Sequence, residues 1–432
     1  MPRQQQLGQL FEERLGDDYP MADVRGTSHA RLPSSTAIGL LVVAILVLAA
    51  GLTLANYRYA ANSPGGNDFI PRWLGTRLLL AKGQNPYGAE TSLAIQEFMY
   101  GRPAKANEDQ VLFVYPLYSA LLFAPFALVG DYVVARALWM TALEMALLAL
   151  AIVSLRLANW RPAAPVLVLV LLFTLSWYHG VRPLINGNAA ILVALFVATA
   201  LLSIRLNRDV TAGLFLALST VKPQAVVLLL PLVLIWAFSR RRYRIVFSTL
   251  ICLALLFILS TLIEPGWLSQ NIHQVVAYPD YTLAGTPAAI FEIWWPSSGR
   301  WLGLATTTVL AILLLQQWRS TLSRDAFVLV PIAFFTLAIT NLIGVTTAAS
   351  NYIALLPGVI ILLAFWRRDK GTFREWPAVL AMILLFVGLW MLFWFSRSGR
   401  AQSPVMFFPV PLILITVLPL LKRASIHPDS TA

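Results

Sequence analysis

IGLLVVAILVLAAGLTLA, residues 38–55, is an apolar stretch of 18 residues that contains no charged side chain. A stretch of this length and composition is typical of a membrane-spanning α-helix. The polar residues before it include Glu12, Glu13, Asp17 and Asp18, and so do not resemble the short cationic start of a cleaved signal peptide. We therefore expect an uncleaved first helix preceded by a disordered cytoplasmic tail, residues 1–37.

Similar apolar segments recur along the whole chain. Of its 432 residues, 58% are hydrophobic and only 12% are charged, and the mean hydropathy is +0.72. Soluble domains carry about 25% charged residues, so this composition excludes a soluble globule and a disordered chain. The pattern predicts an all-α polytopic membrane protein with a bundle of about twelve transmembrane helices, at residues 38–55, 131–155, 164–179, 188–204, 210–222, 225–238, 245–263, 301–318, 326–342, 352–366, 377–396 and 405–421.

The positive charges indicate how such a bundle is oriented. The formal net charge of +12 would suggest nucleic-acid binding in a soluble protein, but here it is first a topology signal. If the apolar run 112–129 spans the membrane, the arginine cluster at 240–244 and the N-terminal tail fall on opposite sides. If the run lies along the outer interface, as a helix broken by Pro116 and Pro125, then 20 of the 32 positive residues face the cytoplasm.

We favour the interface helix, and this choice sets the domain boundaries. It gives a single transmembrane domain, residues 38–421, between two cytoplasmic tails, residues 1–37 and 422–432. The two long connections, residues 56–111 and 264–300, then lie outside the cytoplasm. Because functional residues concentrate on loops, we expect an extracytoplasmic site in a plasma membrane, with the lipid bilayer as a partner and no nucleic acid.

The first outer loop begins with an acidic residue among cations. Asp68 is followed by Arg72, Arg77 and Lys82. Neighbouring cations keep a carboxylate ionised, which suits a general base acting on a hydroxyl group. A solvated loop acid or a helix cap is the alternative, and spacing alone does not decide between them.

Two charged residues lie within apolar parts of the chain. Lys222 is in the turn TVKPQ between two short apolar segments, and Glu144 is in the middle of 131–155. A charge in the membrane is costly unless it has a partner. For Lys222 that partner is either an anionic lipid phosphate or a structural group of the protein. For Glu144 it is either a structural group, such as a buried arginine, or a substrate.

The connection HGVRPLINGN, residues 179–188, brings together His179, Arg182, Asn186 and Asn188. Gly187 permits close approach of the backbone. Asn188 opens the next predicted helix, so it is either a helix cap or a contact to a sugar or a phosphate.

Several kinds of catalytic site are missing from the sequence. The chain has no Walker A, GxGxxG or GxSxG motif. Its four histidines, His29, His179, His273 and His427, show no metal-ligand spacing. No cofactor is expected, and a requirement for a divalent metal stays open. Because no inner loop is long enough for a nucleotide-binding domain, an activated substrate has to come from the membrane.

Four segments in this order resemble glycosyltransferase family 87: NDFIPRW with GQNPYG, VYPLYSALLFAPF, INGN and AGLFLALSTVKPQ. The resemblance covers about residues 38–245. Members of that family are polytopic enzymes of the GT-C superfamily, and they use a polyprenyl-phosphate sugar, typically mannose and in some members arabinofuranose. The resemblance implies a GT-C-like bundle and a hexosyltransferase, with mannose as the expected sugar.

The resemblance also assigns roles to individual residues. Asp68 takes the place of the acidic residue regarded as the catalytic base. The GxxPY element is present, with Tyr87 at its end, and the lysine–proline pair is retained at Lys222. The tyrosine–proline–proline element keeps Tyr115, but Leu117 replaces its second proline. Further departures from the family pattern are Ile185 and Asn186 in place of glycine and glutamine, and Asn351 and Tyr352 where many members have a histidine.

Together these residues suggest an inverting transfer to a hydroxyl of a glycolipid or glycan acceptor on the outer side of the membrane. Asp68 would accept the proton of the acceptor, and Lys222, with Arg182 or Arg72, would bind the donor phosphate. The expected substrate contacts are Asn186, Asn188, Tyr87, Tyr115, His179 and Gln224.

A polytopic transporter or a lipid flippase is the rival interpretation, and a non-catalytic membrane scaffold is a third. The number of helices and Glu144 fit a transporter. However, transporters commonly show internal repeats and binding sites near the midplane of the membrane. This chain shows no repeat, and its main polar cluster is predicted outside, so we favour the enzyme.

Overall fold

The computed structural model describes residues 35–277, 285–343, 349–366, 375–397 and 403–426. By its contacts the chain forms two units, residues 1–50 and 51–432. Most of the two predicted tails, 1–37 and 422–432, lies outside the described residues, so the disorder predicted for residues 1–37 and the cytoplasmic location of both tails stay predictions. Where the tails are described, α2 begins at Ser35 and α20 continues to Ile426, so both helices extend beyond the predicted tail boundaries.

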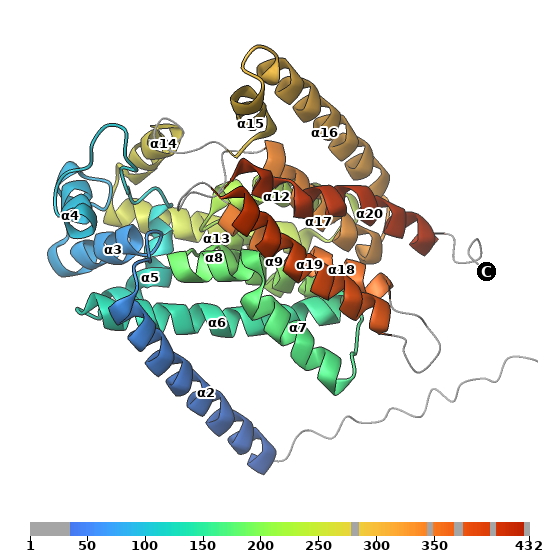
Figure 1. Cartoon of the computed structure of the whole chain (residues 1–432), viewed down its shortest axis with the longest axis horizontal. Helices are drawn as coiled ribbons and strands as arrows, with labels where there is room; N and C mark the ends of the chain where they lie inside the picture. The colour runs from blue at the N-terminus through green and yellow to red at the C-terminus, as the bar shows by residue number, and fades with distance from the viewer. Residues whose placement is uncertain (1–34, 278–284, 344–348, 367–374, 398–402, 427–432) are drawn as a thin grey trace, which may run out of the picture. The chain divides into compact units, whose positions relative to one another are not determined.

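All regular structure in the described residues is helical, which confirms the predicted all-α class. The elements, labelled in Figure 1 where there is room, are α2 (Ser35–Asn62), α3 (Ile70–Lys82), α4 (Ala89–Tyr100), η1 (Leu117–Ser119), α5 (Ala120–Ala127), α6 (Tyr132–Leu157), α7 (Ala164–Ser176), α8 (Tyr178–Asn186), α9 (Ala190–Arg205), α10 (Asp209–Ser219), α11 (Pro223–Val226), α12 (Leu229–Ser239), α13 (Tyr243–Ile263), α14 (Trp267–Ala277), α15 (Pro287–Trp294), α16 (Gly299–Thr321), α17 (Ala326–Ile343), η3 (Ala349–Leu355), α18 (Leu356–Phe365), α19 (Trp376–Ser396), η4 (Pro404–Phe407) and α20 (Pro409–Ile426).

Every predicted span coincides with a helix, but the predicted count of about twelve is not confirmed. Six helices of the described residues are long and apolar enough to cross a membrane, and α7 with α8, bent by 48°, makes a seventh candidate. A crossing needs about 20 helical residues, and the remaining apolar helices, such as α10 and α12 with 11 residues each, are shorter than that. The six helices are α2, α6, α13, α16, α17 and α19.

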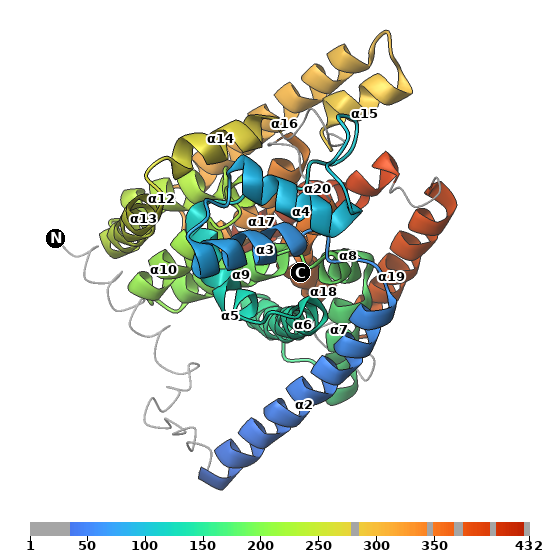
Figure 2. The same ribbon diagram turned by 90° about the vertical axis from the view of Figure 1, so that its left-hand side faces the viewer.

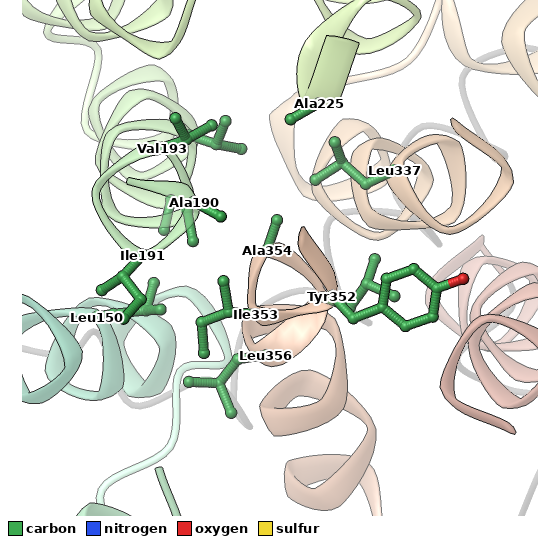
Figure 3. Packing of buried hydrophobic residues seen from close by; sticks show 14 of the residues in the cluster. Leu150, Ala190, Ile191, Val193, Ala225, Leu337, Tyr352, Ile353, Ala354 and Leu356 are labelled. Carbon is green, nitrogen blue, oxygen red and sulfur yellow. The ribbon is translucent and has the colours of Figure 1, made fainter. Parts of the chain in front are cut away.

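The apolar side chains are distributed as in a protein surrounded by lipid. In residues 35–50 the first part of α2 is exposed, with Leu40 at 67% and Val47 at 66%. In residues 51–432, α6 packs against α9, α9 against α10 and α10 against α13, while α17 packs against α20 (Figure 1). The junction of η3 and α18 fills the middle of this unit: Ile353 lies near Leu150 of α6 and Ile191 of α9 (Figure 3).

The connection predicted to be the first outer loop is folded, and it contains α3 and α4. These helices lie with α5 and α14 at one end of the bundle (Figures 1 and 2). Trp73 of α3 donates from its indole to the carbonyls of Phe126 and Val129, and Arg77 donates to the carbonyl of Ala127. These carbonyls belong to residues around the end of α5. The hydrogen bonds therefore hold α3 against the C-terminal end of α5.

Three predicted boundaries are wrong. The interface helix at 112–129 is shorter than expected: only η1 and α5 are helical, and residues 111–116 have no regular structure. The connection predicted to be the first outer loop starts after Asn62 and not at residue 56, because α2 continues to Asn62. Residues 179–186, predicted as a loop, belong to the helix α8, which begins after the break at Trp177.

Candidate functional site

Backbone hydrogen bonds hold Asp68 at the end of α8. The N–H of Asp68 donates to the carbonyl of Asn186 (2.9 Å). Two residues earlier, the N–H of Gly66 donates to the carbonyl of Ile185 (3.0 Å). Gly66 has φ +79°, and a Cβ there would lie 2.2 Å from the hydroxyl of Tyr132. Glycine is therefore needed for the close approach that sets the position of Asp68.

A hydrogen-bond chain joins Asp68 to Lys222 through Asn188. Nδ2 of Asn188 donates to Oδ2 of Asp68 (3.0 Å), and Oδ1 of Asn188 accepts from Nζ of Lys222 (2.9 Å). The same Oδ1 accepts from the backbone N–H of Ala190 (2.9 Å), so Asn188 also caps the first turn of α9. One asparagine thus orients both a carboxylate and an ammonium group.

Two cations lie against the ring of Tyr115. Its centroid is 4.2 Å from Cζ of Arg72 and 5.8 Å from Nζ of Lys222. All three residues are buried, and Arg72 donates from Nη1 to the backbone carbonyl of Asp68 (3.2 Å). Within the described ranges neither cation forms an ion pair with a carboxylate. We call Asp68, Arg72, Tyr115, Asn188 and Lys222 the Asp68 cluster.

Lys222 lies in the turn between α10 and α11, outside the candidate spans. Burial lowers the pKa of its ammonium group to about 8; Asp68 opposes this shift and Arg72 adds to it. The group is therefore still charged near neutral pH. An ammonium group has three N–H donors, and the bond to Asn188 uses one, so donors remain for an anionic ligand.

A second carboxylate, that of Asp109, lies close to the cluster and was not among the residues predicted from the sequence. Asp109 interacts electrostatically with Arg72 and with Asp68, and its Oδ1 accepts from the backbone N–H of Val111 (3.0 Å). The residue as a whole is exposed, but its carboxyl group is partly buried, and this burial raises the pKa of Asp109. The hydrogen bond from Val111 and the positive charge of Arg72 lower that pKa, whereas the negative charge of Asp68 raises it further. Only its position at the end of the first outer loop could have indicated a role.

Two further tyrosines support the cluster. Tyr87 is buried and donates from its hydroxyl to the carbonyl of Tyr115 (2.6 Å). It therefore holds the backbone of Tyr115, while its role as a substrate contact stays a prediction. Tyr118 donates to the carbonyl and to Oγ1 of Thr220 (2.9 and 3.0 Å) and so fixes the turn that precedes Lys222.

A small apolar groove of about 70 Å³ lies beside Tyr118. It is formed by α3, by the segment of η1 and α5, and by the last turns of α13. Thr76, one turn after Arg72, and Tyr118 are part of its wall, so the groove starts close to the buried cations. The other lining residues are Leu79, Leu80, Leu117, Ala120, Leu121, Ala124, Leu259, Ser260 and Ile263.

Four predicted site residues are less closely connected. Asn186 contributes its backbone carbonyl, and no hydrogen bond or ion pair among the described residues joins the side chains of Arg182 or Gln224 to the cluster. His179 is fully buried: its Nδ1 is 3.1 Å from the carbonyl of Ala349, and its ring is 5.1 Å from that of Tyr352. These contacts fix the His179 ring inside the bundle, and its role as a substrate contact stays a prediction.

The half-buried acid of α6, Glu144, has a structural partner. Oε2 of Glu144 accepts from Nδ2 of Asn56 (2.8 Å), not from an arginine. Arg136 of the same helix donates instead to the carbonyl of Ser63, just before Asp68 in the chain (2.8 Å). Among the described residues no group of three or more His, Cys, Asp and Glu side chains could hold a metal ion.

Gly187→Ala is expected to destabilise the protein. Gly187 ends α8 with φ +69°, and a Cβ would lie 2.6 Å from Cβ of Phe69. A left-handed backbone at a non-glycine residue alone costs about 1–3 kcal/mol, and the clash adds to it. Thermal unfolding in detergent should show a lower midpoint. The control is Gly388→Ala, where a Cβ meets nothing within 4 Å; equal midpoints for the two variants would contradict the expected packing.

The geometry thus combines a hydrogen-bonded carboxylate that can accept a proton with two buried cations that can stabilise an anion. A comparison with known protein families gives one match, in which residues 113–340 fit glycosyltransferase family 87. This region contains Tyr115, Asn188 and Lys222, whereas Asp68 and Arg72 precede it. No curated protein and no solved structure matches the chain.

Proposed function

Because the chain belongs to glycosyltransferase family 87, we propose that it is an inverting membrane glycosyltransferase that uses a polyprenyl-phosphate sugar. The sugar would be mannose, and the acceptor a hydroxyl of a glycolipid or glycan. The observation that carries this proposal is the hydrogen-bond chain Asp68–Asn188–Lys222, since it joins a carboxylate and an ammonium group, which are the proposed base and the proposed phosphate-binding cation.

Asp68 is the proposed general base. Its carboxylate would take the proton of the acceptor hydroxyl while the acceptor oxygen attacks the anomeric carbon of the donor sugar. Asn188 binds only Oδ2 of Asp68 among the described contacts, so Oδ1 is the oxygen proposed to receive the proton. Attack from the side opposite the phosphate inverts the configuration of that carbon.

Lys222 and Arg72 are the proposed phosphate-binding groups. As the bond between the anomeric carbon and the phosphate oxygen breaks, its electron pair goes to that oxygen, and polyprenyl phosphate leaves with an added negative charge. Cations that are already in place stabilise this charge without reorganisation. Nε of Arg72 is buried without a partner in the described part of the chain, which supports a role for this guanidinium in binding a ligand. Arg182 remains the alternative cation.

The apolar groove formed by α3, α5 and α13 supports a lipid-linked donor. Its wall contains Thr76, one helical turn after Arg72, so a phosphate bound to Arg72 would leave the first isoprene units facing Thr76 and Leu79. In the proposed topology this end of the bundle is extracytoplasmic, both termini are cytoplasmic and the protein lies in the plasma membrane. A total of about twelve crossings would require the shorter apolar helices to take part as well. Two consecutive short helices would then form one crossing together, or a single short helix would cross where the membrane is thinner.

The rival transporter has lost its main support. Glu144, the acid in the middle of α6, already receives a hydrogen bond from Asn56. An acid with such a partner is accounted for without a transported substrate.

The direct functional test is transfer by the purified protein in detergent. The protein would be incubated with polyprenyl-phosphate mannose or polyprenyl-phosphate arabinofuranose and with a lipid extract as acceptor, and free polyprenyl phosphate would be measured. Release from the mannose donor that depends on the acceptor, without a membrane gradient, is the expected result. Gradient-dependent movement of substrate in vesicles without release of polyprenyl phosphate would support the transporter.

The pH profile should show the titration of Lys222. Its pKa of about 8 belongs to the free enzyme, so kcat/KM for the donor should fall as the pH rises through that value. The ammonium group is charged below this pH and neutral above it, and the neutral amine cannot neutralise the phosphate. In Lys222→Arg the guanidinium stays charged, and the alkaline decline should disappear from the remaining activity. An unchanged decline in that variant would assign it to another group.

A further inference from the structure

The backbone that carries Tyr115 is strained. Val111 and Val114 have φ +45° and +52°, which β-branched residues rarely adopt. The N–H of Tyr115 donates to the carbonyl of Phe113 (2.7 Å) and closes a tight three-residue turn centred on Val114. Such strain persists only where the surroundings hold it in place.

One face of α14, in the second outer loop, holds this turn. Asn271 donates from Nδ2 to the carbonyl of Val114 (2.9 Å), and Oε1 of Gln274 accepts from the N–H of Val114 (3.0 Å). Nε2 of Gln274 also donates to the carbonyl of Tyr87 (3.3 Å). Both amides are buried, with 6% and 7% exposed. The two polar backbone groups of Val114 are therefore both bound by a single helix.

The position of Tyr115 depends on this arrangement. Tyr115 directly follows the strained turn, and its ring contacts the two cations of the Asp68 cluster. The conformation of Val114 decides on which side of the backbone that ring lies. A relaxed Val114 would move the ring away from Arg72 and Lys222.

We propose that Asn271 and Gln274 are positioning residues for the transfer reaction. By holding Val114 in its left-handed conformation, they keep Tyr115 against the cations that bind the donor phosphate. The second outer loop would thus control use of the donor without touching it. The kinetic part of this inference rests on the proposed function, whereas the coupling of Val114 to Gln274 does not.

The test is a rescue experiment with glycine. Gln274→Ala should lower kcat/KM for the polyprenyl-phosphate donor about tenfold, with little change in KM for the acceptor. Glycine adopts positive φ without strain, so Val114→Gly in the Gln274→Ala background should recover most of the loss, whereas Val114→Ala should not. His273→Ala, at an exposed position of the same helix, is the control and should behave like the wild type.

The possible results separate three claims: the positioning role of Gln274, its coupling to Val114, and the proposed function. Failure of glycine to rescue, or an unchanged kcat/KM in Gln274→Ala, would overturn the positioning role. Thermal unfolding of the same set gives a second readout, in which the effects of Gln274→Ala and Val114→Gly should be non-additive; additive effects would overturn the coupling. If the wild type releases no polyprenyl phosphate but the unfolding shows coupling, the proposed function fails and the structural link stands.

Discussion

Asp68→Asn is expected to lower the rate of sugar transfer by about 10²–10⁴-fold, the usual contribution of a general base. The asparagine can still accept the hydrogen bond from Nδ2 of Asn188 through its own carbonyl oxygen. The fold and the position of Lys222 should therefore be kept, and only the ability to take a proton is lost. The measurement is the initial rate of polyprenyl phosphate release at saturating donor and acceptor.

Two matched variants make this prediction specific. Glu108→Gln removes an acid of the same outer loop that is paired with Arg102, outside the Asp68 cluster, and should leave transfer near the wild-type rate. Asp109→Asn removes the second carboxylate near the cluster and should cost much less than Asp68→Asn. A larger loss in Asp109→Asn, with Asp68→Asn nearly normal, would transfer the role of base to Asp109.

Lys222→Met is expected to lower kcat by about 10²–10³-fold, as the removal of one group that stabilises charge in a transition state does in other enzymes. Negative charge on the phosphate increases as the bond to the sugar breaks, so the loss should appear in kcat and in donor use, not in KM for the acceptor. Methionine fills a similar volume, and Oδ1 of Asn188 keeps its bond to Ala190, so the site should stay folded.

The control for Lys222→Met is Lys105→Met, an exposed lysine of the first outer loop. It should leave transfer unchanged, which separates a local effect from the loss of one positive charge. Equal losses toward donor and acceptor in Lys222→Met, together with a lower unfolding temperature, would assign Lys222 a structural role instead.

Much of the helical framework could be predicted from hydropathy, but the number of spans could not. Hydropathy detects contiguous apolar residues and does not distinguish a crossing helix from a buried one. The run 352–366 is an example, because its first part is the short helix η3, which is packed inside the bundle. Likewise, 210–222 and 225–238 contain short helices separated by a turn at Lys222.

The candidate site was predictable where a charged residue lies in an apolar segment of the sequence. A lysine in an apolar context needs a partner, and the structure supplies one in Asn188. The burial of His179 could not be predicted, because its segment was expected to be a loop, whereas it lies on the helix α8 and faces the core. Asn271 and Gln274 could not be found from the sequence, since their role depends on contacts with a different loop more than 150 positions earlier in the chain.

The most direct test of the account is an experimental structure of the protein with bound polyprenyl phosphate, determined in lipid nanodiscs. We expect a phosphate within hydrogen-bonding distance of Nζ of Lys222 and of the guanidinium of Arg72, with the carboxylate of Asp68 in the same cavity. The lipid chain should follow the groove between α3, α5 and α13. A phosphate bound elsewhere in the bundle, or Asp68 and Lys222 on opposite faces of the membrane, would contradict it.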